Sequence, residues 1–420
     1  MYHKRVPLLA LLTMVCLFLI AGGVTAQEDS LTYPIVDTGQ VNCYNDDGDI
    51  IDCSVEGEPF YGQDAQYSSI EFSFTDNGDG TVTDNVTGLM WQQIPDDGDF
   101  TWDEAIIYAE NLELAGYDDW RLPTAKELFS LIDFEPDDGK PVLDTDYFAF
   151  PALSENPGGE PGDAGPQGGA PQDDSETGED TASDMPAPPP ADDEATGGIQ
   201  KSQGQFWSSN FYYVGTTHGD ADTAFGVNHV TGHIKGYPAG DASDEQMGKR
   251  VRVVRGDEYG VNEFVDNGDG TISDLATGLM WMQDDYGEAI EWEAALAHAE
   301  NLEFAGYDDW KLPSVKELQS IVDYSGVYPA VDPDYFNSTM EEDEDYWTWL
   351  WTSTSADESG GSIGAAWYVA FGKAVGLDGL DSHGAGAVRE RQKYAESQYT
   401  EEGDTYVNSL RAVRVITIED

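Results

Sequence analysis

A long stretch of this chain occurs twice. Residues 76–92 read DNGDGTVTDNVTGLMWQ, and residues 266–282, 190 positions later, read DNGDGTISDLATGLMWM. The same offset relates two further pairs of segments: AENLELAGYDDW at 109–120 with AENLEFAGYDDW at 299–310, and RLPTAKEL at 121–128 with KLPSVKEL at 311–318. So many identities at one offset indicate a tandem duplication. The chain is therefore expected to fold as two related modules, each able to fold by itself.

The duplication sets the boundaries of the predicted domains. Repeat 1 covers residues 71–256, repeat 2 covers residues 257–420, and a separate N-terminal segment covers residues 27–70. Residues 1–26 begin with basic residues, continue with an apolar run and end in small residues, which is typical of a secretory signal peptide. No other stretch is apolar enough to cross a bilayer. The mature chain is therefore expected to be secreted, either to the extracellular space or to the periplasm.

Repeat 1 contains a segment of different composition at residues 154–203. This segment is rich in Gly, Pro, Ser, Asp and Glu, and no aromatic residue occurs between Phe150 and Phe206. Such a segment cannot bury enough apolar surface to offset the entropy of ordering it. Repeat 2 has only residues 337–345 at the corresponding place. Residues 154–203 are therefore predicted to be a disordered acidic insertion within repeat 1.

Hydrophobic periodicity predicts an α+β fold for each module. Apolar residues alternate with polar ones on either side of the Asn-Gly-Asp-Gly turn at 77–80, which indicates a β-meander. Helix starts are indicated by N-cap residues followed three positions later by Glu: Thr101 with Glu104, Thr124 with Glu127, and Ser314 with Glu317. Gly116 is placed to end the first helix. Each repeat then finishes in strand patterns.

The net charge restricts the partners. The chain has 82 acidic and 19 basic residues, which gives a formal net charge of −63 at pH 7. Such a chain repels nucleic acid and anionic membranes, so neither is expected as a partner. The charge has two interpretations: it keeps the protein in solution, or it forms a surface rich in bound calcium. Hydrophobic residues still make up 40% of the chain, which is enough for two cores.

Two cysteines remain after the predicted signal peptide, Cys43 and Cys53. In an exported chain, two cysteines that close a short loop predict a disulfide bond. A metal site would need further ligands of the same kind. A reactive thiol would need basic neighbours, whereas these cysteines have acidic ones.

Carboxylates around the glycines of the repeated turn are the candidate metal ligands. They are Asp76, Asp79 and Asp84 in repeat 1 and Asp266, Asp269 and Asp274 in repeat 2. Hard oxygen ligands of this kind suit calcium. However, Asn-Gly and Asp-Gly are also the residues that hairpin turns require. Calcium binding and turn formation are therefore both open as explanations of the motif.

The sequence shows no catalytic motif. It contains no GxSxG elbow, no HExxH zinc motif and no phosphate-binding loop. His229 and His233 have the spacing of some zinc ligands, but they fall in a strand–turn–strand pattern that separates the two rings. His383 lies in a glycine-rich loop without an evident base or nucleophile. We therefore expect no enzyme, although the sequence leaves open a glycosidase that uses paired carboxylates.

The final strand of each repeat is rich in arginine. The residues are Arg250, Arg252 and Arg255 in repeat 1 and Arg411 and Arg414 in repeat 2. In so acidic a chain we expect neighbouring carboxylates to pair with them. Their predicted role is structural.

Taken in order, these motifs resemble a known family. The run DNGDGTxxDxxTGLMW, a helix ending in AGYDDW, the [RK]LP[TS]xxEL segment and a terminal VR-rich strand are similar to the Lcl C-terminal domain family. The resemblance covers nearly all of both repeats, apart from the acidic insertion and residues 378–408. It implies two tandem C-type lectin-like modules, with the LP[TS]xxE segment similar to part of the formylglycine-generating sulfatase-modifying fold. Both mature cysteines lie upstream of the repeats, so the cysteine chemistry of formylglycine-generating enzymes is not implied.

Two functional hypotheses follow. The family is named after the C-terminal region of a bacterial collagen-like adhesin that binds sulfated glycans, and the negative charge of this chain would repel sulfates. The first hypothesis is an exported, non-enzymatic adhesion-type protein that recognises a glycan or another surface component, with duplication raising avidity. The second is an acidic structural or matrix protein that holds cations and water. Exposed aromatic residues beside a pocket would favour the first, and buried aromatic residues without a shared pocket would favour the second. The stretch that decides between them contains Trp347, Trp349 and Trp351.

Overall fold

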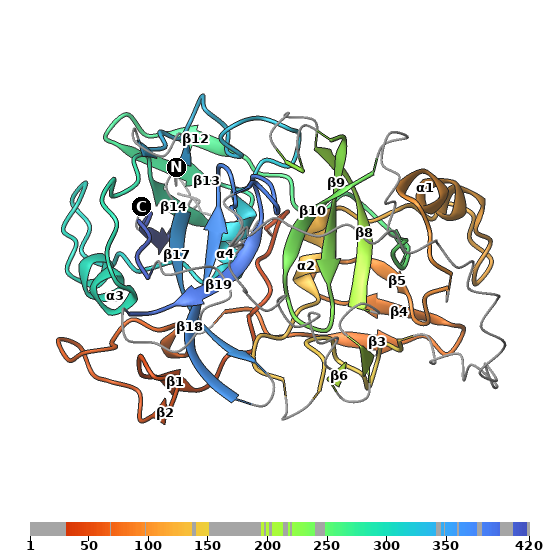
Figure 1. Cartoon of the computed structure of the whole chain (residues 1–420), viewed down its shortest axis with the longest axis horizontal. Helices are drawn as coiled ribbons and strands as arrows, with labels where there is room; N and C mark the ends of the chain where they lie inside the picture. Colours follow the sequence, from red (N-terminus) through yellow and green to blue (C-terminus); the bar gives the residue numbers. More distant parts are fainter. Residues whose placement is uncertain are drawn as a thin grey trace, which may run out of the picture. The chain divides into compact units, whose positions relative to one another are not determined.

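Figure 1 shows the computed structural model of the chain. The residues that the structure describes are 31–67, 69–96, 98–136, 140–150, 195–196, 199–200, 204–212, 217–218, 221–239, 248–341, 346–347, 349–358, 361–375, 380–394 and 406–417. They belong to one compact unit, Leu31–Asp420. The predicted signal peptide lies outside the described residues, as does most of the predicted acidic insertion.

Each repeat opens with an antiparallel meander that its last strand completes. The strands of repeat 1 are β3 (Phe74–Asp76), β4 (Thr81–Asp84), β5 (Met90–Gln92) and β11 (Val254–Arg255), and those of repeat 2 are β12 (Phe264–Asp266), β13 (Thr271–Asp274), β14 (Leu279–Met282) and β20 (Val413–Val415). The strand orders are β11-β5-β4-β3 and β12-β13-β14-β20. The buried pair Val82 and Trp91 in repeat 1 has its equivalent in Ile272 and Trp281. The predicted meander is therefore confirmed in both copies.

Two helices follow the meander in each repeat, which confirms the α+β class. They are α1 (Trp102–Asn111), α2 (Ala125–Ser130), α3 (Trp292–Glu300) and α4 (Val315–Ser320). The predicted capping boxes at Thr101, Thr124 and Ser314 are all present, and each satisfies two helix N-terminal N–H groups. Helix α3 begins after Glu291 without a side-chain cap, because this position has no Ser, Thr, Asp or Asn.

The predicted end of the first helix is wrong. Helix α1 ends at Asn111, because Leu112 already has an extended backbone. Gly116 lies beyond it in a tight turn, where Leu114 and Tyr117 exchange two main-chain hydrogen bonds of 3.1 and 3.0 Å. The φ of Gly116 is +82°, which a glycine adopts without strain.

The two repeats are joined by one continuous antiparallel sheet. Its strands are β8 (Gln205–Tyr212), β9 (Thr223–Asn228) and β10 (Ile234–Pro238) from repeat 1, and β17 (Trp349–Glu358), β18 (Gly361–Ala370) and β19 (Val388–Gln392) from repeat 2. The order is β17-β18-β19-β10-β9-β8. Figure 1 shows the strands of repeat 1 in green beside those of repeat 2 in blue. The junction is the pairing of Ile234 in β10 with Val388 in β19.

The repeats also share their largest hydrophobic core. Phe134 of repeat 1 packs edge-to-face on Trp367 of repeat 2, with ring centroids 5.1 Å apart, and Phe225 packs on Tyr324 at 4.9 Å. A module cut at the repeat boundary would expose these rings and one edge of the joined sheet. The expectation that each repeat folds by itself therefore disagrees with the packing, whereas the proposed boundaries in the sequence stay a prediction.

The N-terminal segment packs on both repeats. It contains β1 (Cys43–Tyr44), β2 (Ile50–Ile51) and the 3-10 helix η1 (Asp64–Gln66). The predicted disulfide is present, because Cys43 and Cys53 are bonded and their Cα atoms lie 5.2 Å apart. Gln40 exchanges two hydrogen bonds with the main chain of Ser355 in repeat 2. This segment is therefore part of the folded unit.

Four further short strands form two hairpins. They are β6 (Ala195–Thr196) with β7 (Ile199–Gln200), and β15 (Met340–Glu341) with β16 (Tyr346–Trp347). The first hairpin lies at the C-terminal end of the predicted disordered insertion. The structure pairs these four residues, and the predicted insertion before residue 195 lies outside the described residues, so its disorder stays a prediction.

The tryptophans of the repeated motifs are core residues. Trp120 and Trp310 are buried, and their indole N–H groups donate to the carbonyl oxygens of Leu114 and Phe304. In the stretch that was to decide between the two hypotheses, Trp349 and Trp351 are also buried, because they pack between β17 and the rest of repeat 2. The side chain of Trp347 lies outside what the structure describes.

The arginines of the last strands are structural, as predicted, but carboxylates are only some of their partners. Arg255 pairs with Asp119 and Arg414 with Asp309. Arg252 is fully buried and donates to the main-chain carbonyl oxygens of Gln92, Gln93 and Ala149 at 2.8–2.9 Å. Its equivalent, Arg411, donates to the carbonyl oxygens of Met282, Gln283 and Asn337. Each buried guanidinium thus joins the meander to the segment that follows the second helix.

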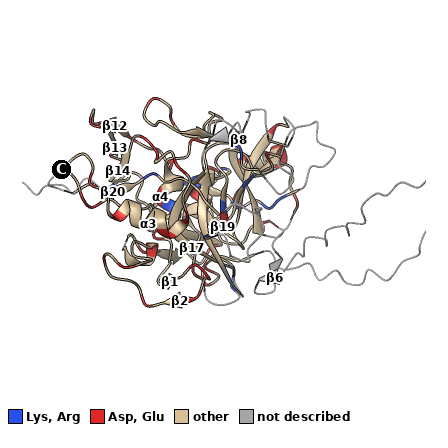
Figure 2. Cartoon of the chain, turned by 60° about the vertical axis from the view of Figure 1, so that its left-hand side comes forward, with Lys and Arg blue, Asp and Glu red and all other residues tan. Residues whose placement is uncertain are grey.

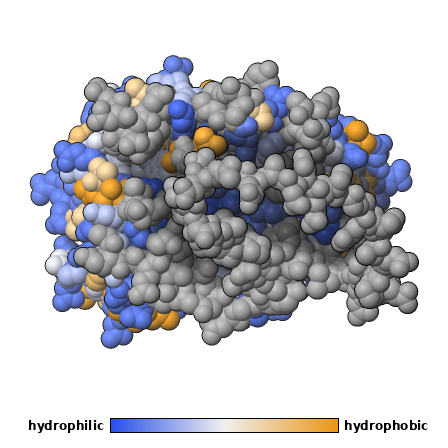
Figure 3. All heavy atoms as spheres, in the orientation of Figure 1, coloured by the Kyte–Doolittle hydropathy of each residue, from blue (hydrophilic) through white to orange (hydrophobic). Residues whose placement is uncertain are grey.

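Acidic residues greatly outnumber basic residues in the chain. Figure 2 shows Asp and Glu on turns and loops, whereas Lys and Arg are fewer. In Figure 3 the apolar residues of the described part of the visible face form separate spots and no continuous patch. Within the described residues, no helix has the length and apolar character needed to cross a membrane.

Arg252→Met is expected to lower the free energy of unfolding by about 3 kcal/mol, because three buried carbonyl oxygens lose a charged donor. Arg255→Met is the matched control and should cost much less, because the Arg255–Asp119 pair is solvent-exposed. Urea unfolding followed by tryptophan fluorescence measures both. Equal losses would contradict the assigned role of Arg252.

Candidate functional site

The predicted metal ligands form hydrogen bonds within their own turns. Asp76 accepts from the N–H of Gly78, and Asp79 accepts from the N–H and hydroxyl of Thr81. Asp84 accepts from the N–H groups of Val86 and Thr87.

Repeat 2 shows the same arrangement at Asp266 and Asp269. There, Asp274 accepts from Ala276, Thr277, Asn262 and Glu263. Among the described residues, no group of three or more His, Cys, Asp or Glu side chains is arranged to hold a metal ion. The turn explanation thus accounts for these carboxylates, and calcium binding stays a prediction.

His229 and His233, which have the spacing of some zinc ligands, bind different partners in the fold. His229 is buried against the carbonyl oxygen of Leu128, 3.1 Å away, and burial lowers its pKa to about 3. The ring of His233 contacts the carboxylate of Glu390 and so ties β10 to β19. Burial and, to a smaller extent, nearby cations lower the pKa of His383 to about 2. His229 therefore serves the packing within repeat 1, and His233 links the two repeats.

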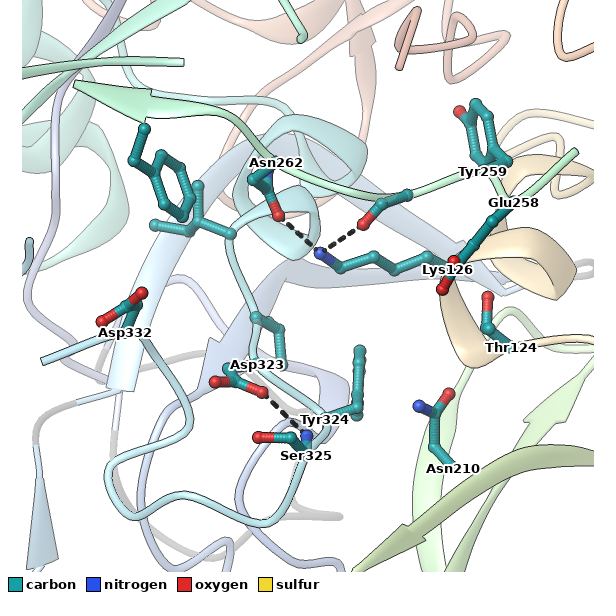
Figure 4. A pocket seen from close by; sticks show the side chains of 14 residues that line it. Thr124, Lys126, Asn210, Glu258, Tyr259, Asn262, Asp323, Tyr324, Ser325 and Asp332 are labelled. Atoms are coloured by element: carbon teal, nitrogen blue, oxygen red, sulfur yellow. Dashed lines mark hydrogen bonds between the residues drawn. The ribbon is translucent and has the colours of Figure 1, made fainter. Parts of the chain in front are cut away.

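A polar pocket lies where the two repeats meet, beside the N-terminus of α2. Its volume is about 350 Å³, and Figure 4 shows its lining. Repeat 1 supplies Thr124, Lys126 and Asn210. Repeat 2 supplies Asn262, Asp323 and Tyr324, with Ser325, Asp332 and Glu258 around them. We call this cavity the inter-repeat pocket.

Lys126 crosses from repeat 1 to repeat 2 along one side of the pocket. Its ammonium donates to the carbonyl oxygen of Gly260 at 3.1 Å and to the side-chain oxygen of Asn262 at 2.8 Å (Figure 4). Loss of hydration lowers the pKa of Lys126 to about 8, although the carboxylates of Asp274 and Asp323 oppose this shift. Lys126 is therefore close to neutralisation only in mildly alkaline solution.

A second donor of the pocket lies on β8, beside the start of α2. The side-chain oxygen of Asn210, in β8, accepts from the N–H of Ala125 at 2.7 Å. Its amide nitrogen makes no hydrogen bond within the described part of the chain and is turned toward the pocket in Figure 4. Asp323 accepts from the N–H of Ser325, which fixes the loop on the opposite wall. The pocket can therefore offer donors to a ligand as well as carboxylate acceptors.

Sequence reasoning missed this pocket. Lys126 and Lys316 stand at the same place in the two LP[TS]xKEL segments, each beside a capping box. A lysine repeated on a short helix with an apolar face is a signal that could have been found. Asn210 and Asp323 carry no local signal, because they meet Lys126 only through the packing of the two repeats.

Lys316 allows a pH test of these buried lysines. It is buried, and loss of hydration lowers its pKa from 10.5 to about 7. Between these two values the unfolded chain holds the proton and the folded chain does not, so stability rises with pH in this window. Lys316→Met should make this rise smaller, because other buried lysines with lowered pKa values, such as Lys126, still contribute to it, whereas Lys140→Met, at an exposed lysine, should leave it unchanged. Urea unfolding from pH 7 to 10 measures the slopes, and an unchanged slope in Lys316→Met would contradict the shift.

Comparison with known proteins agrees with the order of the motifs. The model of the Lcl C-terminal domain matches residues 80–255 and 270–390, one match in each repeat. No curated protein matches the chain, and no solved structure does. The C-type lectin-like fold implied by the resemblance therefore stays a prediction. The two matches cover more than half of the chain, so the protein belongs to the Lcl C-terminal domain family and carries two copies of its domain.

Proposed function

We propose that this protein is an exported, non-enzymatic adhesion-type protein that engages a surface component through the inter-repeat pocket. Membership of the Lcl C-terminal domain family favours an adhesion-type protein. The observation that carries the proposal is a polar pocket whose walls come from both repeats. Duplication would thus create a binding site that neither repeat has alone.

The size and lining of the pocket support a small polar ligand group. A volume of about 350 Å³ is at the lower end for ligand sites, which favours one residue or one sugar unit of a larger ligand. Asn210 and Lys126 are donors, and Asp323 and Asp332 are acceptors. Hydroxyl and amide groups can satisfy both kinds of partner. A glycan or the surface of another protein could present such groups.

The charge narrows the ligand class. Three carboxylates, those of Glu258, Asp323 and Asp332, line the pocket of a chain with net charge −63. A sulfated glycan would therefore meet repulsion both at long range and at the site. The proposal favours a ligand without strong negative charge.

A non-enzymatic role is supported by the chemistry of the lining. The lining residues include no histidine or cysteine, and the carboxylate of Asp323 accepts from the main-chain N–H of Ser325. Lys126, the one lysine of the lining, is held by Gly260 and Asn262. This arrangement suits binding better than nucleophilic chemistry.

The second candidate is an acidic structural or matrix protein. It is favoured by the burial of Trp349 and Trp351, because these residues do not form an exposed aromatic surface for sugars. In that role the protein would hold cations and water and would need no pocket. The two proposals therefore differ in the effect that blocking the pocket would have on binding.

Ser325→Trp is the test, because Ser325 is exposed at the pocket and a tryptophan there would fill the mouth. Binding of the mature protein to glycan arrays and to intact cells should fall at least about tenfold, the effect of losing one well-placed contact. Ile107→Trp, at an exposed position on α1, is the matched control and should bind as the wild type does.

The assays are run with calcium and with a chelator, which also tests the predicted calcium dependence. Undiminished binding by Ser325→Trp would exclude the pocket as the site. No binding by the wild type to any glycan or cell would favour the structural role.

A further inference from the structure

The inter-repeat pocket has an equivalent surface on the other side of the α2–α4 contact. The repeat offset and the topology pair its residues as follows: Lys126 with Lys316, Asn210 with Thr354, Asp323 with Asp133, Tyr324 with Phe134, and Ser325 with Glu135. The hydrogen bonds agree with this pairing. Asp323 accepts from Ser325 N–H at 2.8 Å, as Asp133 does from Glu135 N–H at 2.9 Å.

The helix ends are equivalent in the same way. Asn210 accepts from the N–H of Ala125 at the start of α2, and Thr354 accepts from the N–H of Val315 at the start of α4. The duplication therefore built two related surfaces. We call the second one, around Lys316, the covered surface.

The N-terminal segment occupies the covered surface. Lys316 donates to the carbonyl oxygen of Asp37 at 2.7 Å, and the N–H of Phe134 donates to the carbonyl oxygen of Thr38 at 2.7 Å. Gly39 lies against Asp133, so closely that a Cβ there would come within 2.3 Å of the carboxylate.

Two further residues of this surface bind the segment. Glu135 accepts from the N–H groups of Val41 and Asn42, and Thr354 donates to the carboxylate of Asp64 at 2.5 Å. All five residues of the covered surface thus contact an extended piece of polypeptide or the 3-10 helix that follows it.

The same donors are available in the inter-repeat pocket. The N–H of Tyr324, equivalent to that of Phe134, makes no hydrogen bond within the described residues. The amide nitrogen of Asn210, equivalent to the hydroxyl of Thr354, makes none there either. On the covered surface these two positions bind a main-chain carbonyl and a carboxylate.

We infer that the inter-repeat pocket binds an extended polypeptide segment that presents a main-chain carbonyl to Tyr324 N–H and an acidic or amide side chain to Asn210. This inference rests on the proposed function and specifies its ligand. The chain's own residues 37–42 are the pattern for such a segment. A glycan could offer oxygen acceptors as well, and the polypeptide segment that binds the equivalent surface favours a peptide.

The position of Lys126 fits this ligand. On the covered surface, the N–H of Asp37 donates to the carbonyl oxygen of Ile70, and the carbonyl oxygen of Asp37 accepts from Lys316. In the pocket, the equivalent of Ile70 is Gly260, whose carbonyl oxygen accepts from Lys126. In the same way, a residue of a bound segment would donate its N–H to the carbonyl oxygen of Gly260 and accept from Lys126 with its own carbonyl oxygen. The hydrogen bond between Lys126 and Gly260 thus occupies both groups until a peptide replaces it.

One difference between the two surfaces predicts selectivity. Glu135, which holds the N–H groups of Val41 and Asn42, is replaced by Ser325. The pocket therefore binds its ligand with fewer hydrogen bonds than the covered surface does. Weak, exchangeable binding is expected, which suits recognition of a partner better than permanent closure.

The test uses the mature protein and a fluorescent peptide with the sequence of residues 35–66, which starts with IVDTGQVN, carries the Cys43–Cys53 disulfide and includes Asp64, the partner of Thr354. Anisotropy is measured at protein concentrations up to about 1 mM, and a scrambled peptide serves as the ligand control. Asn210→Asp keeps the acceptor for Ala125 and removes the amide donor. It should weaken binding at least about tenfold, because a hydrogen bond to a charged group is lost and a like charge is added.

Asn111→Asp makes the same chemical change at an exposed residue of α1 and should bind as the wild type does. Lys126→Met should also bind weakly, and its thermal unfolding shows whether the fold is kept.

Equal binding by wild type and Asn210→Asp would overturn the inference. The inference would also be overturned if the protein bound a glycan but not the peptide, and if Ser325→Trp blocked the glycan. In that case the proposed function would stand without the inference. Failure of both ligands would remove both proposals.

Discussion

Buried cations held by main-chain carbonyl oxygens are the interaction on which this fold depends. The chain has only 19 basic residues, yet Arg252, Arg411, Lys316 and Lys393 are all buried. Each donates to carbonyl oxygens of segments distant in sequence, as Lys393 does to Asn45 at 3.0 Å. Removing a cation from water is costly unless its donors are satisfied, so these contacts fix which segments meet. Several carboxylates are buried as well, among them those of Glu127 and Asp274, and these accept hydrogen bonds from neighbouring donors.

The same cations explain how a duplicated chain became asymmetric. Lys126 and Lys316 occupy equivalent places, but Lys316 holds the N-terminal segment and Lys126 holds the segment that begins repeat 2. The N-terminal segment that the structure describes lies on the surface around Lys316, and it cannot cover the equivalent surface around Lys126 at the same time. The inter-repeat pocket is therefore a geometric consequence of duplicating the surface on which this segment lies. The shared sheet and core then make both repeats necessary for the site.

Local patterns predicted much of the fold. The turn at 77–80, the capping boxes at Thr124 and Ser314 and the Cys43–Cys53 pair each involve residues close in sequence, and the structure confirms them. The joining of the repeats could not be predicted, because the pairing of Ile234 with Val388 depends on contacts between residues far apart. The pocket was missed for the same reason: Asn210 and Asp323 become neighbours of Lys126 only after the repeats pack.

Hydrogen exchange at two single amides tests the central claim most directly, namely that the N-terminal segment covers one of two equivalent surfaces and that no residue the structure describes covers the other. The Phe134 N–H is bonded to Thr38, whereas the Tyr324 N–H has no partner in the described part of the chain. We predict slow exchange at Phe134, fast exchange at Tyr324, and slowing at Tyr324 alone when the peptide of residues 35–66 is added. Equal protection of the two amides in the free protein would contradict the account.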